Sequence, residues 1–404
     1  MKILFYILAI VFCFRFMGVF EVPSTTMSIC FLLMGFLNYK KELPFNKYII
    51  LLFAFLLLNF FSCWYFNGQT LLDSFRASNE FYSLSLFWFF YSWKFNLEQW
   101  EKALWWICLC FGLCYLIQYI AFPNIIFGGQ IRTGSDEQRM AIYGQGLASF
   151  SVIFGINKYL TTRKIKYVII ILTGIFAVFG CGYRTMLLAL MISTLLLVMK
   201  LGVSKRIIIS GSFIAIIFYF FAINTDLVQS QFANMINRQE SLNDHGFEND
   251  IRYINLIYHY TEYFKSPIEL FLGSGMPFKE SIYGNYQSNI MINTYGFHYA
   301  DWGLIGLSWM IGIPAVLIML LYSYRIFRTK VPEKYMYIGI YFFNIVISSI
   351  TSHEFYIHQN FVVQAILFCV FTKILENSKQ PLYASKSKRN RNVKMVKLYI
   401  NSHK

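Results

Sequence analysis

Residues 48–66 read YIILLFAFLLLNFFSCWYF, a run of 19 residues without a charged side chain. About 20 apolar residues in a helix cross the roughly 30 Å hydrocarbon layer of a bilayer. Similar apolar runs recur along the whole chain, at residues 3–20, 24–38, 48–66, 80–93, 103–123, 143–160, 167–181, 184–199, 207–223, 303–323, 335–351 and 361–375. The sequence therefore predicts an all-α polytopic membrane protein with about 12 transmembrane helices, in a range of about 10 to 13.

The composition agrees with a membrane protein. Of 404 residues, 57% are hydrophobic, 20% aromatic and only 14% charged, which does not describe a soluble surface. The formal net charge of +15 comes from short clusters of Lys and Arg between the apolar runs and in the tail. Such clusters are typical of loops that face anionic lipid, so the expected partner is the lipid bilayer and not nucleic acid.

The distribution of charge predicts an orientation, because Lys and Arg are retained on the cytoplasmic side of membrane proteins. With the N-terminus inside, most Lys and Arg fall in cytoplasmic loops and most Asp and Glu fall outside. Both termini are therefore expected in the cytoplasm. The expected organisation is nine transmembrane helices in residues 1–223, a large outer loop at 224–300, three more helices in 301–375 and a basic cytoplasmic tail at 376–404.

The large outer loop contains one helix with two candidate functional side chains. Asp250 is expected to cap a helix over residues 251–264. Arg252 and His259 are seven residues apart and so share a face of this helix, where they could bind an anion and transfer a proton. The alternative is a solvated helix face with Glu262 alongside.

Three further arginines stand at the edges of apolar runs on the outer side. Arg184 opens the run 184–199 and either extends outward to water or meets an anion, because burying it in hydrocarbon costs at least about 2.5 kcal/mol. Arg132 and Arg139 flank a short polar segment, and they either clamp a phosphate or pair with the acidic residues between them, Asp136 and Glu137.

His298 and Asp301 precede the apolar run 303–323. They are three residues apart and lie on one side of the chain if this segment is helical. A candidate general base and a carboxylate would then stand together at the outer membrane face.

Neither a metal nor a cofactor is expected. His353, Glu354 and His358 in the last outer loop lack the spacing of a known zinc motif. None of the eight cysteines falls in the large loop, so they indicate neither disulfides nor a zinc site. The sequence GSG at 273–275 is not a nucleotide-binding loop, since no Lys-Ser or Lys-Thr pair follows it.

The order of these features resembles the O-antigen polymerase and O-antigen ligase superfamily. The resemblance rests on GYRTMLL at 182–188, on Arg252 followed by Pro267 and the Gly-Ser-Gly segment at 273–275, and on the segment from His298 to Gly306. A weaker similarity lies in IRTG at 131–134. These motifs are short, but the topology matches over most of the chain.

The resemblance implies a multi-pass glycosyltransferase of the bacterial inner membrane that takes part in surface polysaccharide biosynthesis, such as that of lipopolysaccharide. Its donor and acceptor would be undecaprenyl-diphosphate-linked glycans at the periplasmic face, without a metal or other cofactor, and a chain-length regulator in the same membrane would be a partner. A diphosphate leaving group needs cationic donors, for which the candidates are Arg184, Arg252, Arg132 and Arg139. An acceptor hydroxyl needs a base, for which His298 is the first candidate, with Asp301 beside it.

Two other functions compete with the polymerase. An O-antigen ligase would transfer the finished glycan to lipid A-core, but ligases tend to carry an Asn directly after the histidine, where this chain has Tyr299 and Ala300. A flippase or transporter of lipid-linked oligosaccharide would place polar residues at mid-membrane in broken helices. In this sequence the polar residues gather on one outer face, which favours the polymerase.

Overall fold

The computed structural model describes residues 24–122, 124–127, 129–133, 138–142, 146–181, 184–202 and 250–378. The spans predicted at 3–20 and 207–223, the first part of the large loop and the tail after residue 378 lie outside the described residues. The described part confirms a helical fold, to which one short β-hairpin is an addition that the all-α prediction did not include.

The elements before the large loop are α2 (Ser24–Leu37), α3 (Asn46–Asn67), α4 (Leu71–Ala77), the 3-10 helix η2 (Phe81–Ser85), α5 (Leu86–Ser92), α6 (Leu97–Ala121), strands β1 (Gly129–Thr133) and β2 (Gln138–Ile142), α7 (Gly146–Thr162), α8 (Lys166–Cys181) and α9 (Arg184–Lys200). Those of the described loop are α12 (Ile251–Tyr258), the π-helix η4 (His259–Tyr263), α13 (Pro267–Leu272), α14 (Ile282–Tyr286), the π-helix η5 (Gln287–Ile292) and the 3-10 helix η6 (Tyr299–Trp302). After it come α15 (Gly303–Ile311), α16 (Ile313–Arg328), η7 (Glu333–Tyr335), α17 (Met336–Ser348), η8 (Glu354–Tyr356) and a last helix, His358–Ser378.

Three helices within the described residues are long and apolar enough to cross a membrane by length and composition: Asn46–Asn67, Leu97–Ala121 and His358–Ser378. Shorter apolar helices accompany them, among them Lys166–Cys181. These helices support the prediction of a polytopic membrane protein, and the number of 12 spans stays a prediction.

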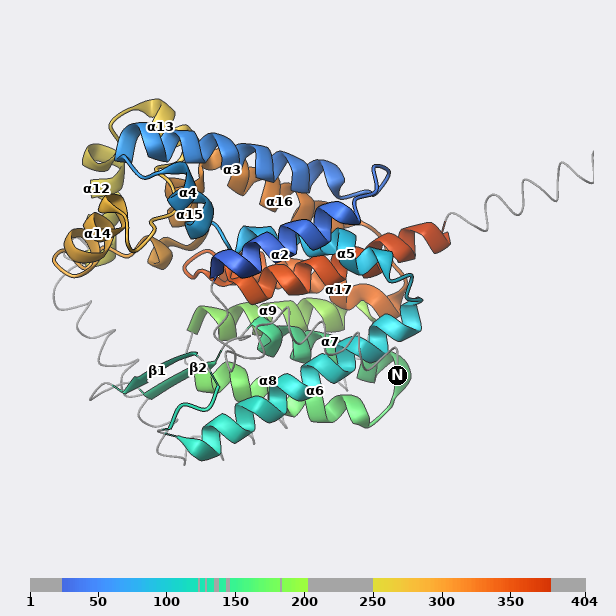
Figure 1. Cartoon of the computed structure of the whole chain (residues 1–404). Coiled ribbons are helices and arrows are strands. Elements are labelled where there is room, and N and C mark those ends of the chain that lie inside the picture. Colours follow the sequence, from blue (N-terminus) through green and yellow to red (C-terminus); the bar gives the residue numbers. More distant parts are fainter. Residues whose placement is uncertain are drawn as a thin grey trace, which may run out of the picture.

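The described helices run between two ends of the molecule (Figure 1). At one end, two hydrogen bonds join helices to connections. Arg325 Nη1 of α16 donates to the carbonyl of Pro44, in the connection after α2, over 3.3 Å, and Asn157 Nδ2 of α7 donates to the carbonyl of Glu333, in the connection after α16, over 2.9 Å. Helices α12, α13 and α14 and the β-hairpin lie at the opposite end, which we call the loop end (Figure 1).

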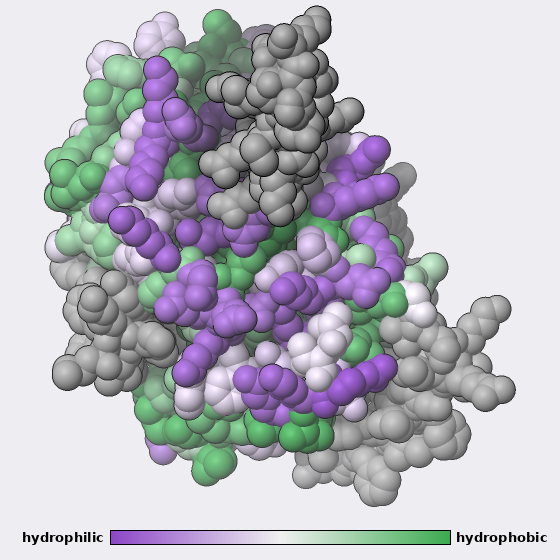
Figure 2. Space-filling model, turned by 90° about the vertical axis from the view of Figure 1, so that its right-hand side faces the viewer, coloured by the Kyte–Doolittle hydropathy of each residue, from purple (hydrophilic) through white to green (hydrophobic). Residues whose placement is uncertain are grey.

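At the end opposite to α12, hydrophilic residues gather across the middle of the face that Figure 2 shows. We call it the basic end, because its connections and helix ends carry the exposed residues Lys40, Lys41, Lys94, Arg163, Lys164, Lys166, Arg328, Lys330 and Lys334. The sequence assigns the same connections to the cytoplasm and the large loop to the outside. The two predicted sides of the chain therefore correspond to the two ends of the helical bundle.

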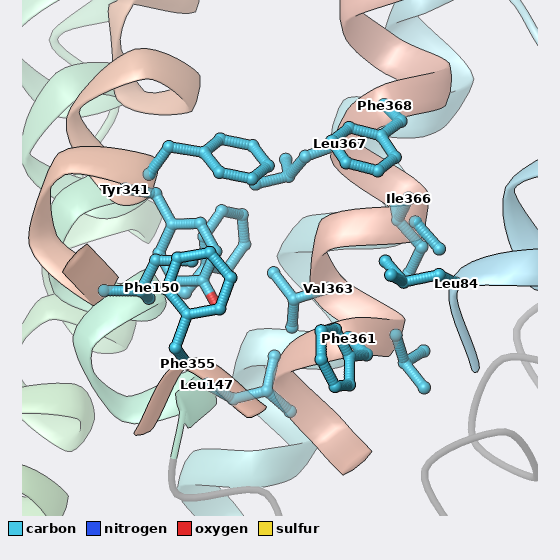
Figure 3. Packing of buried hydrophobic residues seen from close by; sticks show 14 of the residues in the cluster. Leu84, Leu147, Phe150, Tyr341, Phe355, Phe361, Val363, Ile366, Leu367 and Phe368 are labelled. Carbon is cyan, nitrogen blue, oxygen red and sulfur yellow. The ribbon is translucent and has the colours of Figure 1, made fainter. Parts of the chain in front are cut away.

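The last helix lies in the interior of the bundle. Its side chains from Val362 to Phe371 are all buried, and Figure 3 shows Phe361, Val363 and Leu367 among residues of other helices such as Phe150 of α7 and Tyr341 of α17. Aromatic rings fill much of this core, with Phe342 and Phe368 stacked at a centroid distance of 5.6 Å. A helix that is apolar on every side is buried on every side, as its composition requires.

The span expected over residues 303–323 is interrupted. Gly312 stands between α15 and α16 with φ 89° and ψ 153°. Glycine reaches this region without strain, and Pro314, which follows in the first turn of α16, cannot donate a backbone hydrogen bond. The sequence indicated one continuous helix because the run is apolar throughout. The distant loop contacts the chain at this break, as described next.

Candidate functional site

Side chains of helix α3 and of the turn after it form hydrogen bonds with main-chain groups of the large loop. Four side chains each donate to a carbonyl of the loop over 2.8 to 2.9 Å, namely Asn59 to Leu272, Ser62 to Gly273, Asn67 to Ser274 and Gln69 to Met276. Gln69 also accepts from the backbone N–H of Phe278 over 2.9 Å. Because donors follow one another along the segment, residues 272–278 are fixed against α3.

The other edge of this segment meets the end of α15. The backbone N–H groups of Ser274 and Gly275 donate to the carbonyls of Trp309 and Met310, each over 2.8 Å. Asn59 Nδ2 donates to the carbonyl of Met310 as well, also over 2.8 Å. The loop thus supplies donors to carbonyls next to the break between α15 and α16, where an unpaired buried carbonyl would be costly.

A buried carboxylate that sequence reasoning missed completes this attachment. Glu269 is 1% exposed; its Oε1 accepts from Asn67 Nδ2 over 3.0 Å and its Oε2 accepts from the backbone N–H of Lys265 over 2.8 Å. Ser266 caps α13 by accepting from the backbone N–H of Glu269 over 3.2 Å. The Ser-x-x-Glu spacing is a helix-start signal that could have indicated this arrangement.

The predicted helix of the large loop forms and begins where expected. Asp250 Oδ1 accepts from the backbone N–H of Arg252 over 2.7 Å, which caps α12. The helical path continues as a π-helix to Tyr263 and ends at Phe264. The segment 251–264 was therefore predicted with its correct ends, although not with its change from α-helix to π-helix.

Two hydrogen bonds join α12 to the segment before α15. Asn255 Nδ2 donates to the carbonyl of His298 over 3.2 Å, and Trp302 Nε1 donates to the carbonyl of Arg252 over 3.0 Å. Asn255 is 1% exposed, and the first of these bonds is partly buried. Side chains on the two segments are consequently held in a fixed relation to each other.

Arg252, Asp301 and His298, all candidates from the sequence, come together at this junction. Arg252 Nε lies 3.7 Å from Asp301 Oδ2, and the two side chains are 46% and 39% exposed. The backbone N–H of Asp301 donates to the carbonyl of His298 over 3.1 Å, and the His298 side chain is exposed. An exposed ion pair contributes only about 0–1 kcal/mol, so an anionic ligand can replace Asp301 as the partner of Arg252.

His259 does not join this group at the surface. Its ring is 1% exposed and stacks on Trp309 at a centroid distance of 4.1 Å, while Nδ1 lies 2.9 Å from the carbonyl of Asn255. Burial lowers the pKa of His259 to about 4, so the ring is neutral at neutral pH. Glu262 is exposed on the following turn. The structure thus places Arg252 in solvent and His259 in the interior.

The other three arginines lie on separate elements. Arg132 and Arg139 occupy directly opposite positions in the antiparallel pair β1–β2, at the loop end of the molecule (Figure 1). Arg184 is the first residue of α9, and only two residues separate it from Cys181 at the end of α8. These positions bring Arg132 and Arg139 together as a pair, but in a hairpin distinct from the junction of α12 and η6.

The connection between α17 and the last helix uses its polar side chains for packing. His358 Nδ1 lies 2.7 Å from Ser83 Oγ, and its ring stacks on Phe31. Glu354 is 4% exposed, and Asn360 Nδ2 donates to its Oε2 over 3.3 Å. In the part of the chain that the structure describes, no group of three or more His, Cys, Asp or Glu side chains could hold a metal ion.

Comparisons with protein-family models, with curated proteins and with solved structures found no match to this chain. The resemblance to the O-antigen polymerase and ligase superfamily therefore stays a prediction from the sequence.

Proposed function

We propose that this chain is a surface-polysaccharide polymerase, an inverting glycosyltransferase that joins undecaprenyl-diphosphate-linked repeat units at the periplasmic face of the bacterial inner membrane. The observation that carries the proposal is the junction of α12 and η6, where Arg252, Asp301 and His298 meet at the end of the bundle opposite to the basic end. A cation, a carboxylate and an exposed imidazole are the groups that transfer from a diphosphate leaving group requires.

The proposed reaction uses the imidazole as the base and the guanidinium as the partner of the leaving group, while the carboxylate holds the guanidinium at rest. An acceptor hydroxyl attacks the anomeric carbon of the donor from the face opposite to the diphosphate, so a new carbon–oxygen bond forms as the carbon–oxygen bond to phosphate breaks. The hydroxyl proton passes to His298 and then to water. The diphosphate keeps the electron pair of the broken bond, and Arg252 stabilises the added negative charge.

Hydrogen bonds hold this junction in place. This supports a catalytic role for the junction and argues against a mobile connector. Residues 272–278 are fixed between α3 and α15, and α12 is tied to His298 and Trp302 by two hydrogen bonds. Preorganised donors stabilise a transition state because they need no rearrangement when charge develops.

The broken span at Gly312 is a feature that transporters also have. It therefore bears on the alternative function, a flippase of lipid-linked oligosaccharide. In transporters, the free backbone groups of broken helices bind substrate or ions. Here the carbonyls of Trp309 and Met310 accept hydrogen bonds from Ser274, Gly275 and Asn59. These carbonyls are occupied by the protein itself, which supports the enzyme over the flippase.

Deletion of the gene in its host, followed by electrophoresis of the surface polysaccharide, tests the proposal. Loss of a polymerase leaves lipid A-core with a single repeat, loss of a ligase leaves none attached while long lipid-linked chains accumulate, and loss of a flippase leaves neither. We expect the single-repeat pattern, and the same pattern on complementation with Arg252→Ala or His298→Ala at normal protein abundance.

Lys279→Ala is the matched control, because Lys279 is an exposed cation of the same loop. It should restore the full ladder. A ladder of normal length from both Arg252→Ala and His298→Ala would remove these residues from the site, and either of the other two deletion patterns would replace the polymerase by the ligase or the flippase.

A further inference from the structure

Two cations of the basic end converge on one aromatic ring. Lys47 Nζ lies 5.0 Å from the centre of the Tyr48 ring, and the guanidinium carbon of Arg325 lies 5.8 Å from the same centre. Lys47 stands in the first turn of α3, and Arg325 stands in the last turn of α16. Two elements that are distant in the sequence therefore bring two positive charges to one place.

Contacts between α3 and α16 fix this arrangement. Arg325 Nη1 donates to the carbonyl of Pro44, just before α3, over 3.3 Å. The Tyr48 ring meets the edge of the Tyr322 ring of α16 at a centroid distance of 6.3 Å. The two helices run side by side (Figure 1). We call the line where they meet near the basic end the α3–α16 seam, and its residues are Lys47, Tyr48, Leu51, Leu321 and Arg325.

The two cations of the seam lack an acidic partner. In the part of the chain that the structure describes, neither Lys47 nor Arg325 forms an ion pair. Glu42, in the connection before α3, is exposed and pairs with neither of them. Lys47 is exposed and Arg325 is partly exposed, so a ligand can reach both. Neighbouring like charges repel each other, and a bound anion removes this cost.

An exposed leucine lies one helical turn from each cation. Leu51 follows Lys47 by four residues on α3 and is 46% exposed, and Leu321 precedes Arg325 by four residues on α16 and is 55% exposed. Residues four apart share a helix face. Because α3 begins and α16 ends at the basic end, both leucines lie toward the middle of the bundle. Two cations at the end of an apolar surface match a ligand with an anionic head and a hydrocarbon chain.

We propose that the α3–α16 seam binds one anionic phospholipid of the surrounding bilayer, with its phosphate between Lys47 and Arg325 and an acyl chain over Leu51 and Leu321. The basic end corresponds to the side that the sequence predicts in the cytoplasm, so the lipid belongs to the inner leaflet. The leucines distinguish the seam from a site for free phosphate. This site lies at the opposite end of the bundle from Arg252, and it does not depend on the proposed reaction.

Lipid binding by the purified full-length protein tests the seam. Native mass spectrometry of the protein in detergent, titrated with phosphatidylglycerol, gives the dissociation constant of the first bound lipid. Lys47→Gln and Arg325→Gln should each raise this constant about fivefold, and the double variant about 25-fold, the effect of two cations beside one anionic head group. Phosphatidylcholine should bind roughly tenfold more weakly than phosphatidylglycerol, because its choline group cancels the phosphate charge.

The double variant Arg163→Gln, Lys164→Gln is the matched control. It also removes one Arg and one Lys, from exposed positions of the same basic end. It should bind phosphatidylglycerol as the wild-type protein does. Arg325→Lys keeps the charge and should also bind almost normally, which separates the charge from the hydrogen bond to Pro44.

Three results would overturn the proposal. Equal losses of affinity in the seam and control double variants would show that the lipid is held only by the general charge of the basic end. Displacement of the lipid by inorganic phosphate, or equal affinity for phosphatidylcholine, would show that the seam does not recognise an anionic phospholipid. Tighter binding of undecaprenyl diphosphate than of phosphatidylglycerol would assign the seam to a substrate lipid.

Discussion

Arg252 Nε and Asp301 Oδ2 are 3.7 Å apart, across the junction between a helix of the large loop and the segment that leads into α15. Both side chains are partly exposed, so water and ligands reach the pair. In this geometry Arg252 is a cation whose partner in the free protein, Asp301, is weakly held.

The first prediction concerns the shape of the cation. Arg252→Ala should lower the rate of repeat-unit transfer about 100-fold or more, as the loss of one preorganised charge donor does in other enzymes. Arg252→Lys should keep part of the activity, because it retains the charge but not the planar fork that binds two phosphate oxygens. Initial rates of transfer by the purified variants test whether Arg252→Lys is faster than Arg252→Ala. Equal rates for the two variants would show that Arg252 does not contact the diphosphate.

The second prediction concerns the glycine that packs against α3. Gly275 has φ 95°, and a Cβ there would overlap the Cys63 side chain. Gly68 also has a positive φ, 67°, but has nothing within 4 Å of the same position. Gly275→Ala should therefore lower the thermal unfolding temperature in detergent clearly more than Gly68→Ala, which carries only a backbone cost of about 1 kcal/mol.

Equal losses for the two alanine variants would mean that residues 272–278 are not fixed as described. A further variant of the same contact, Asn59→Ala, removes donors to the carbonyls of Leu272 and Met310 and should cost about 1–3 kcal/mol.

The third prediction concerns pH. The pKa of His259 is lowered by burial from its ordinary value of 6.5 to about 4. The unfolded chain therefore binds a proton that the folded chain does not between these values. The stability due to the neutral ring is fully present above about pH 6.5 and is lost as the pH falls toward 4, by roughly 3 kcal/mol in total.

His259→Phe keeps a ring against Trp309 and removes this titration. The unfolding temperature of the wild-type protein should fall faster between pH 6.5 and 4 than that of the variant, measured in the same detergent. Parallel curves for the two proteins would show that His259 is not buried as a neutral ring.

The fourth prediction concerns the basic end. Lys158 of α7 is 1% exposed, donates to the Glu101 carboxylate of α6 and lies 5.0 Å from the centre of the Tyr335 ring. Glu101→Gln leaves a buried ammonium without its counter-charge and should cost up to about 3 kcal/mol. The double variant Glu101→Gln, Lys158→Met should recover much of this loss, as urea unfolding can measure. A double variant less stable than Glu101→Gln would contradict the ion pair.

The sequence could predict those features that depend on neighbouring residues. The apolar runs at 48–66 and 167–181 became α3 and α8 with boundaries within two residues, and Asp250 caps α12 as its position before a helix indicated. These predictions succeed because apolar length and capping are local properties.

Features that depend on distant contacts were not accessible in this way. The break at Gly312 is stabilised by residues 274–275 and Asn59, and no periodicity links these segments. His259 and Arg252 are seven residues apart, yet His259 is buried against Trp309 and Arg252 is exposed.

Reconstitution is the most direct measurement of the proposed activity. The purified protein is placed in liposomes whose only substrate is the lipid-linked repeat unit of the host, and the lipid-linked products are separated by size. We predict a ladder of lipid-linked oligomers with release of undecaprenyl diphosphate, absent with His298→Ala and present with Lys279→Ala. A repeat unit that stays monomeric with the wild-type protein, or that only crosses the bilayer, would contradict the polymerase.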